Sequence, residues 1–191
     1  MKKLLVIAVL AMAINALGQI PTDGLIGYWP FSGSANDLSN NAFHGVVYGA
    51  MLTTDRFGNP NSAYHFDGIS AYITLNNDMP VIQSLDFTIS AWAKMDGLSG
   101  GLNREGIIFE QRHDLVTETS STIVLIPENK DGNTWFMART NTGAREEIIG
   151  SPVGYGYWHH YIASVGSDDT LRFYIDGLEI GREYYAPTGN F

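Results

Sequence analysis

Residues 87–95 read FTISAWAKM, and they decide the fold class because apolar and polar side chains alternate along them. A period of two is typical of a β-strand with one face toward a core and the other toward solvent. Trp92 and Lys94 fall on the face opposite the first residue, Phe87. The stretch therefore predicts a half-buried strand whose inward face is formed by Phe87, Ile89, Ala91, Ala93 and Met95.

A second group of strands is expected near the C-terminal end of the sequence. Trp158–Val165 reads WHHYIASV, and Thr170–Asp176 reads TLRFYID after a polar turn. Asp176 and Gly177 both tolerate a positive φ, so they predict a two-residue hairpin from which Leu178–Tyr185 runs back. Three consecutive antiparallel strands follow from this pattern.

Shorter alternating runs, separated by Gly, Asn and Asp, fill the remaining sequence. No run has the 3.6-residue period of a convincing helix, although a single helical turn is expected near residues 79–85. The pattern predicts an all-β, antiparallel two-sheet jelly-roll sandwich formed by one domain, residues 19–191. The further strands are expected at Leu25–Phe31, Gly45–Tyr48, Ala63–Phe66, Tyr72–Leu75, Ile107–Gln111, Ser121–Ile126, Trp135–Arg139 and Arg145–Ile149.

Residues 1–18 read MKKLLVIAVLAMAINALG and have the form of a removable secretory signal peptide. Two lysines precede an apolar run that is shorter than the roughly 20 residues needed to span a bilayer. Ala16 and Gly18 place small residues at the cleavage site, so we expect cleavage before Gln19. The mature chain is expected to be secreted or displayed at the cell surface, without inserting into a membrane.

The charge of the chain limits the partners that suit it. Its 191 residues include 20 acidic and 11 basic side chains, which gives a formal net charge of −9. Such acidity disfavours non-specific binding to nucleic acid or to anionic lipid, and favours neutral or cationic partners. The chain has no cysteine, which excludes disulfides, thiolate metal sites and a cysteine nucleophile.

Three segments resemble the laminin G-like jelly-roll domains of the concanavalin A-like lectin/glucanase superfamily. They are Gly24–Gly49, with GLIGYWPF and ANDLSNNAFHG; Ser62–Leu75, SAYHFDGISAYITL; and Phe87–Trp92, FTISAW, continued by Trp158–Gly181. The last stretch, WHHYIASVGSDDTLRFYIDGLEIG, also resembles the pentraxin branch. The resemblance implies recognition through loops at one rim, and further strands after the one ending at Tyr185. We therefore expect a longer native polypeptide that continues past Phe191.

Two features of the sequence bear on catalysis: a pattern typical of a serine hydrolase and the positions of the glutamates. Gly97–Gly101 has the G-x-S-x-G spacing of a hydrolase nucleophile, but no helix is expected after it, so a flexible loop is the better interpretation. Glycosidases need two carboxylates about 5–10 Å apart, which the superfamily's glucanases supply as Glu-x-Asp-x-Glu. That motif is absent, and Glu146/Glu147, like Glu105/Glu110, face opposite sides of a strand. We expect no catalytic residues and no enzyme activity.

Asp37, within ANDLSNN, and Asp67, before Gly68, have two interpretations. Many related domains bind calcium at matching loop positions, and calcium takes six to eight oxygen ligands. Alternatively, both carboxylates accept backbone N–H hydrogen bonds in Asx-turns. Calcium is the one cofactor that the sequence suggests.

His159 and His160 are adjacent in an expected strand, so they face opposite sides and do not chelate one ion together. We expect one to pack inward with a hydrogen bond and the other to face solvent. Core packing is expected for the four tryptophans, which are Trp29, Trp92, Trp135 and Trp158. Tyrosines near strand ends are the better candidates for ligand contacts, and these are Tyr155, Tyr157, Tyr184 and Tyr185.

These features favour a non-catalytic carbohydrate- or protein-binding module that recognises a glycan or an extracellular protein, with or without calcium. Loops rich in Gly and Asn would make the contacts, at Asp96–Gly106, Glu128–Asn133 and Thr140–Ala144. Two alternatives stay open. One is a structural or adhesin spacer without a ligand, and the other is an ancillary domain of a glycoside hydrolase.

Overall fold

The computed structural model describes residues 20–75, 86–97, 106–113, 121–127, 131–139 and 145–184. Within these ranges the regular structure is β throughout, in twelve strands, which confirms the predicted fold class. The same ranges contain no apolar helix of membrane-spanning length. The expected signal peptide, the helical turn near 79–85 and Tyr185 lie outside the described residues.

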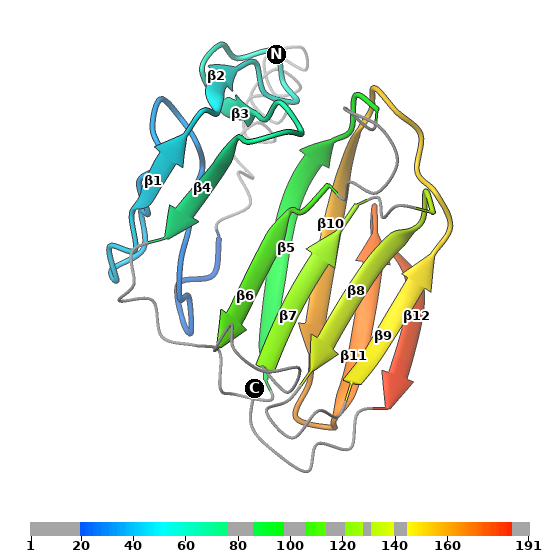
Figure 1. Cartoon of the computed structure of the whole chain (residues 1–191). Coiled ribbons are helices and arrows are strands. Elements are labelled where there is room, and N and C mark those ends of the chain that lie inside the picture. Colours follow the sequence, from blue (N-terminus) through cyan, green and yellow to red (C-terminus); the bar gives the residue numbers. More distant parts are fainter. Residues whose placement is uncertain are drawn as a thin grey trace, which may run out of the picture.

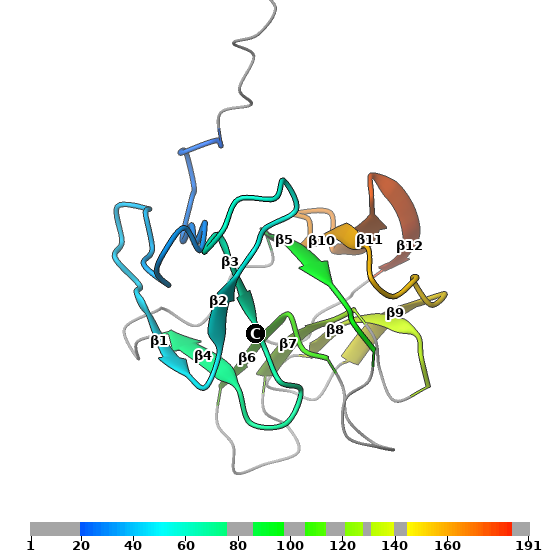
Figure 2. The same cartoon turned by 90° about the horizontal axis from the view of Figure 1, so that it is seen from above.

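Two four-stranded antiparallel sheets form the sandwich (Figure 1). The first sheet has the order β12–β11–β10–β5 and the second has the order β6–β7–β8–β9. Seen from above, they lie as two facing layers (Figure 2). The strands of the first sheet are β5 (Phe87–Lys94), β10 (Trp158–Val165), β11 (Thr170–Ile175) and β12 (Leu178–Tyr184); those of the second are β6 (Phe109–His113), β7 (Ser121–Ile126), β8 (Thr134–Arg139) and β9 (Arg145–Gly150).

The predicted alternation along β5 is confirmed, with Phe87 buried and Trp92 on the exposed face. β10 pairs with β5 so that Val165 lies opposite Phe87, and both side chains enter the same core. Across the sandwich, the ring centroids of Phe136 in β8 and Phe173 in β11 are 6.2 Å apart. The two sheets are therefore held together by their inward-facing apolar side chains.

The hairpin between β11 and β12 has the geometry that its sequence predicts. Asp176 has φ +52° and Gly177 has φ +80°, so both central residues adopt the left-handed conformation of a type I′ turn. This twist matches that of the flanking strands. The hairpin brings the start of β12 back beside the end of β11, with Leu178 opposite Ile175.

Residues 20–75 form an N-terminal segment beside the sandwich (Figure 1). It contains two short two-stranded antiparallel sheets. One pairs β1 (Gly45–Tyr48) with β4 (Tyr72–Leu75), and the other pairs β2 (Met51–Thr53) with β3 (Ala63–His65). The sequence did not predict β2, whose residues Met-Leu-Thr show no alternation of apolar and polar side chains.

The strand predicted at Leu25–Phe31 is wrong. Its backbone is bonded by the following loop and not by a neighbouring strand: Tyr28 N donates to Asp37 Oδ1 at 2.8 Å, Asn41 Nδ2 donates to Ile26 O at 2.8 Å, and the backbone N–H of Leu38 donates to the carbonyl of Tyr28 at 2.8 Å. Trp29 Nε1 donates to the carbonyl of Phe43 at 2.8 Å. The apolar stretch GLIGYWPF therefore forms an irregular segment that is tied to its own loop.

Candidate binding site

The two adjacent histidines of β10 face opposite sides of the first sheet, as predicted. His159 lies opposite Ala93 on the inward face, and its Nδ1 is 2.7 Å from Oδ2 of Asp176. His160 lies on the outward face, where its ring stacks on Trp92 with centroids 4.8 Å apart and an angle of 7°. The prediction of one inward, hydrogen-bonded histidine is thus confirmed for His159.

Asp176 joins the hairpin turn to β10 through both carboxylate oxygens. Oδ2 contacts Nδ1 of His159, and Oδ1 accepts a hydrogen bond from the backbone N–H of His160 at 2.9 Å. These bonds, that of His159 first, lower the pKa of Asp176, so the side chain is ionised at neutral pH. It remains 47% exposed. The result is a fixed carboxylate at the end of the sandwich where β10 begins, which we call the upper end (Figure 1).

A hollow of about 440 Å³ lies at this upper end. One wall is the chain leaving β9, and the other is the β11–β12 hairpin. β9 and β12 approach each other closely at the floor of the hollow. Gly150 of β9 lies so near β12 that a Cβ atom added to it would be 2.5 Å from the side chain of Ile180. The lining consists of residues 149–153, His159, Ile175, Asp176 and residues 178–180.

The hollow was not predicted from the sequence, which pointed to loops and not to this gap between layers. Parts of the predicted loops that lie outside the described residues are 98–105, 128–130 and 140–144. One feature of the sequence nevertheless indicates the site. Leu178 is an aliphatic residue directly after the Asp176-Gly177 turn, and its side chain is 73% exposed to solvent.

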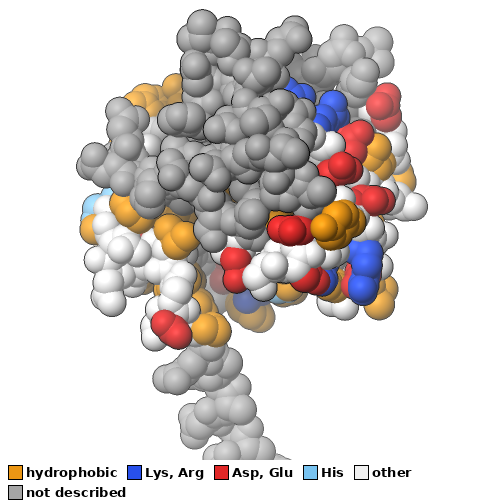
Figure 3. Space-filling model, turned by 90° about the horizontal axis from the view of Figure 1, so that it is seen from below, with side chains coloured by type: hydrophobic (Ala, Val, Ile, Leu, Met, Phe, Trp, Pro, Cys, Tyr) orange, Lys and Arg blue, Asp and Glu red, His pale blue; other side chains and the backbone are white. Residues whose placement is uncertain are grey.

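The candidate tyrosines do not form one group. Tyr155 and Tyr157 lie between β9 and β10 at the upper end, with 49% and 70% exposure. Tyr184 is 68% exposed, but it pairs with Thr170 at the opposite, lower end. Figure 3 views the molecule from below and shows acidic side chains interspersed with basic ones. The upper end thus combines two of the described tyrosines with the hollow.

The prediction of core packing is wrong for Trp92, which is 43% exposed. Its position in β5 points it outward, and the guanidinium of Arg56 from the N-terminal segment lies 4.5 Å from its ring centroid. The other three tryptophans are half-buried. Trp135, for example, packs against the smaller cluster of Val124, Ile126 and Met137 and donates to Glu147 Oε2 at 2.9 Å.

Asp37 is buried, with 3% exposure, and its carboxylate organises the loop around it. Oδ1 accepts from the N–H groups of Tyr28 and Ser39, each at 2.8 Å. Oδ2 accepts from the hydroxyl of Ser39 at 2.7 Å and from the N–H of Phe43 at 2.9 Å. Burial opposes ionisation, but these bonds outweigh it and lower the pKa of Asp37.

Asp67 plays a similar role in an exposed loop. Its Oδ1 accepts from the N–H groups of Ile69, Ser70 and Ala71 at 2.8 to 2.9 Å, which lowers its pKa. Both aspartates thus make the contacts of the Asx-turn interpretation. Among the described residues, no three His, Cys, Asp or Glu side chains gather in a metal-binding group. Calcium binding stays a prediction.

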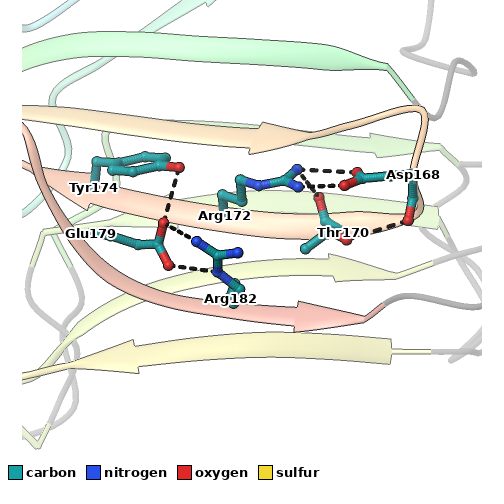
Figure 4. Close-up of polar contacts among 6 residues, drawn as sticks. All are labelled: Asp168, Thr170, Arg172, Tyr174, Glu179 and Arg182. Carbon is teal, nitrogen blue, oxygen red and sulfur yellow. Dashed lines mark hydrogen bonds and ion pairs between the residues drawn. The ribbon is translucent and has the colours of Figure 1, made fainter.

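Several carboxylates on the strands or in the adjoining turns are paired with arginines. Glu110 pairs with Arg112 and Glu147 with Arg145 in the second sheet. In the first sheet, Asp168 of the β10–β11 turn pairs with Arg172, and Glu179 accepts from Arg182 at 2.7 Å and from Tyr174 at 3.2 Å (Figure 4). These arginines lower the pKa of Asp168 to about 2 and lower that of Glu179. The arrangement favours ionised carboxylates, whereas a general acid needs a raised pKa.

Comparison with known proteins agrees with this architecture. A search of the curated proteins finds no match to the chain. The solved structure of the binding domain of Paraclostridial Mosquitocidal Protein 1 is similar, with a TM-score of 0.56 and 21% identity, and the match covers 81% of this chain and 38% of that one. The family model described as the concanavalin A-like lectin/glucanases superfamily matches residues 67–190. The chain therefore belongs to the concanavalin A-like lectin/glucanases superfamily.

Proposed function

We propose that this chain is a non-catalytic module that binds a glycan at the upper end of its sandwich. The observation that carries the proposal is the hollow itself, where exposed aliphatic side chains lie beside the carboxylate of Asp176. Tyr155 and Tyr157 are exposed in the same β9–β10 connection that supplies one wall of the hollow. Sugars offer C–H faces that pack on aromatic and aliphatic side chains, and hydroxyl groups that donate to carboxylates. The upper end presents all three kinds of group.

A binding role is also supported by the family and by the toxin binding domain that shares the fold. Because one fold hosts many functions, the stronger support comes from the side chains themselves. Strand carboxylates such as Glu147 and Glu179 are engaged by arginines, which suits a recognition surface better than acid catalysis. The glycan-binding proposal does not depend on calcium, and the effect of calcium on Tm tests the two interpretations of Asp37 and Asp67 separately.

The same proposal places the protein outside the cell. Residues 1–18 carry the charged start, apolar run and small residues of a secretory signal. N-terminal sequencing of protein from the culture medium should therefore begin at Gln19. A first residue of Met1 would contradict export by a cleaved signal.

A glycan array tests the binding function directly. We expect the chain to bind a restricted set of oligosaccharides and to release no reducing sugar from the corresponding polysaccharides. Tyr157→Ser should weaken this binding because it removes an exposed ring at the upper end. Tyr184→Ser is the matched control, since its exposure is similar but it lies at the lower end. Absence of binding to every glycan would instead favour the spacer function.

A further inference from the structure

We propose that the hollow at the upper end binds one neutral sugar residue, with Asp176 as the acceptor for its hydroxyl groups. This inference rests on the proposed glycan-binding function and adds the pocket, the recognition residue and the charge class of the sugar. The volume of about 440 Å³ lies within the roughly 300–1,000 Å³ range of small-molecule sites. A single pyranose ring therefore has room to enter.

The walls of the hollow suit the C–H face of a sugar ring. Leu178 is 73% exposed and Ile180 is 36% exposed, and both line the hollow beside Val153. Exposed aliphatic groups that gather in one concave place are typical of a ligand site. A sugar ring that packed on these side chains would remove their surface from water.

Asp176 supplies the directional contact. Each carboxylate oxygen already accepts one hydrogen bond, from His159 or from the backbone of His160, and each retains a second lone pair. The two bonds and the type I′ turn fix its orientation before a ligand arrives, which reduces the entropy lost on binding. Hydrogen bonds from hydroxyl groups to an ionised acceptor are also stronger than those to a neutral one.

The charge of the lining determines the class of sugar. Asp176 and Glu179 line the hollow, and no Lys or Arg of the described part of the chain does so. Arg182 engages the carboxylate of Glu179, which leaves Asp176 as the negative group that an incoming sugar would meet. A sulfated or uronic sugar would bring a like charge close to Asp176. Neutral sugars are therefore favoured.

Two variants of the full chain test this assignment. Leu178→Trp places a larger side chain at the mouth of the hollow, where high exposure makes it compatible with folding. Asp176→Asn removes the charge, while asparagine still tolerates the left-handed turn conformation. Leu38→Trp is the matched control, because Leu38 is 63% exposed and lies in the N-terminal segment. Circular dichroism and Tm establish that each variant is folded.

The probe is an array of neutral, sulfated and sialylated oligosaccharides. We expect the wild-type chain and Leu38→Trp to bind neutral glycans and Leu178→Trp to lose this binding. Asp176→Asn should weaken the affinity by about tenfold or more, and a tenfold loss corresponds to about 1.4 kcal/mol. Folded Leu178→Trp that still binds would overturn the pocket assignment but leave the glycan-binding function standing. Binding confined to sulfated or sialylated glycans would overturn the neutral class. No binding to any glycan would remove the proposed function and this inference together.

Discussion

The sandwich and the N-terminal segment are built on different physical principles. Between residues 87 and 175, large side chains such as Tyr161, Phe136 and Phe173 are fully buried between two sheets. In the described residues 20–75, the buried apolar side chains are Ala35 and Ala63, which are small. Larger ones such as Phe57 are exposed there. The sandwich is therefore stabilised by its core, and the N-terminal segment needs another source of order.

Carboxylate side chains provide that order. Asp37, Asp55 and Asp67 each accept hydrogen bonds from backbone N–H groups within six residues, and Asp37 also reaches Tyr28. Such bonds satisfy loop backbone without a strand partner, but they are local and each contributes little. The two regions should consequently respond differently to mutation, with global loss of stability in one and local loosening in the other.

The largest effect is expected from Phe136→Ala in the core. Phe136 has 0% exposure, so its removal should lower the free energy of unfolding by about 3–5 kcal/mol. Urea denaturation followed by circular dichroism measures the loss. The matched control is Phe57→Ala, where the ring is 72% exposed and a loss below about 1 kcal/mol is expected. Similar losses in the two variants would contradict the proposed difference between the regions.

A smaller, local effect is expected from Asp37→Ala. The change leaves the N–H groups of Tyr28, Ser39 and Phe43 without their acceptor, at a cost of about 1–3 kcal/mol. Hydrogen exchange should speed up at these amides, while the amide of Phe173 in the core keeps its protection. If exchange accelerated equally in both regions, the N-terminal segment would be part of the same cooperative unit as the sandwich.

The same contrast explains which parts of the fold were predictable from the sequence. In the sandwich, every second side chain along such a strand faces the core, so the alternation of apolar and polar residues predicts strands at Phe87–Met95 and Trp158–Val165. The turn at Asp176-Gly177 was readable because few residues tolerate positive φ. In the N-terminal segment, Leu25–Phe31 is apolar without that alternation, and its backbone is bonded by Asp37 and Asn41 of the following loop, which a strand pattern does not reveal.

The candidate site was predictable only in part. The opposite faces of His159 and His160 follow from their adjacency. Tyr155 and Tyr157 are candidates for ligand contacts from their place near a strand end, and that role stays a prediction. The partner of His159 could not be predicted, because Asp176 reaches it across the hairpin. The hollow depends on the distance between two layers, which a one-dimensional pattern does not contain. Trp92 is exposed despite its aromatic ring because its position in β5 places it on the outward face.

A moderate effect of pH is expected where the two regions meet. His160 carries a pKa below its ordinary value of 6.5, because burial and the nearby Arg56 disfavour its charged form, while Asp176 acts weakly in the opposite direction. As the pH falls below about 6.5, the unfolded chain therefore binds a proton that the folded chain does not. Stability should decrease there, by at most about 1.4 kcal/mol per pH unit.

Thermal unfolding between about pH 7.5 and pH 5.5 measures this slope. His160→Gln should flatten the slope of stability against pH, since glutamine does not titrate. Arg56→Ala should make the slope smaller, because the charge of Arg56 is one of the two causes that lower the pKa of His160. The carboxyl groups of Asp168 and Asp176 do not titrate in this window, because their pKa values are lowered. An unchanged slope in His160→Gln would assign the pH dependence to another group.

The smallest effect is expected from calcium, and it decides between the two interpretations of Asp37 and Asp67. The oxygens of Asp37 accept four hydrogen bonds and Oδ1 of Asp67 accepts three, so a calcium ion would have to compete with these N–H and O–H donors for the carboxylates. Addition of about 5 mM CaCl2, above the roughly 10⁻⁴–10⁻³ M dissociation constants of extracellular calcium modules, should leave Tm unchanged. A saturable rise in Tm that disappears in Asp67→Asn would establish a calcium site in this loop. The N-terminal segment would then be ordered by a metal ion as well as by its carboxylate turns.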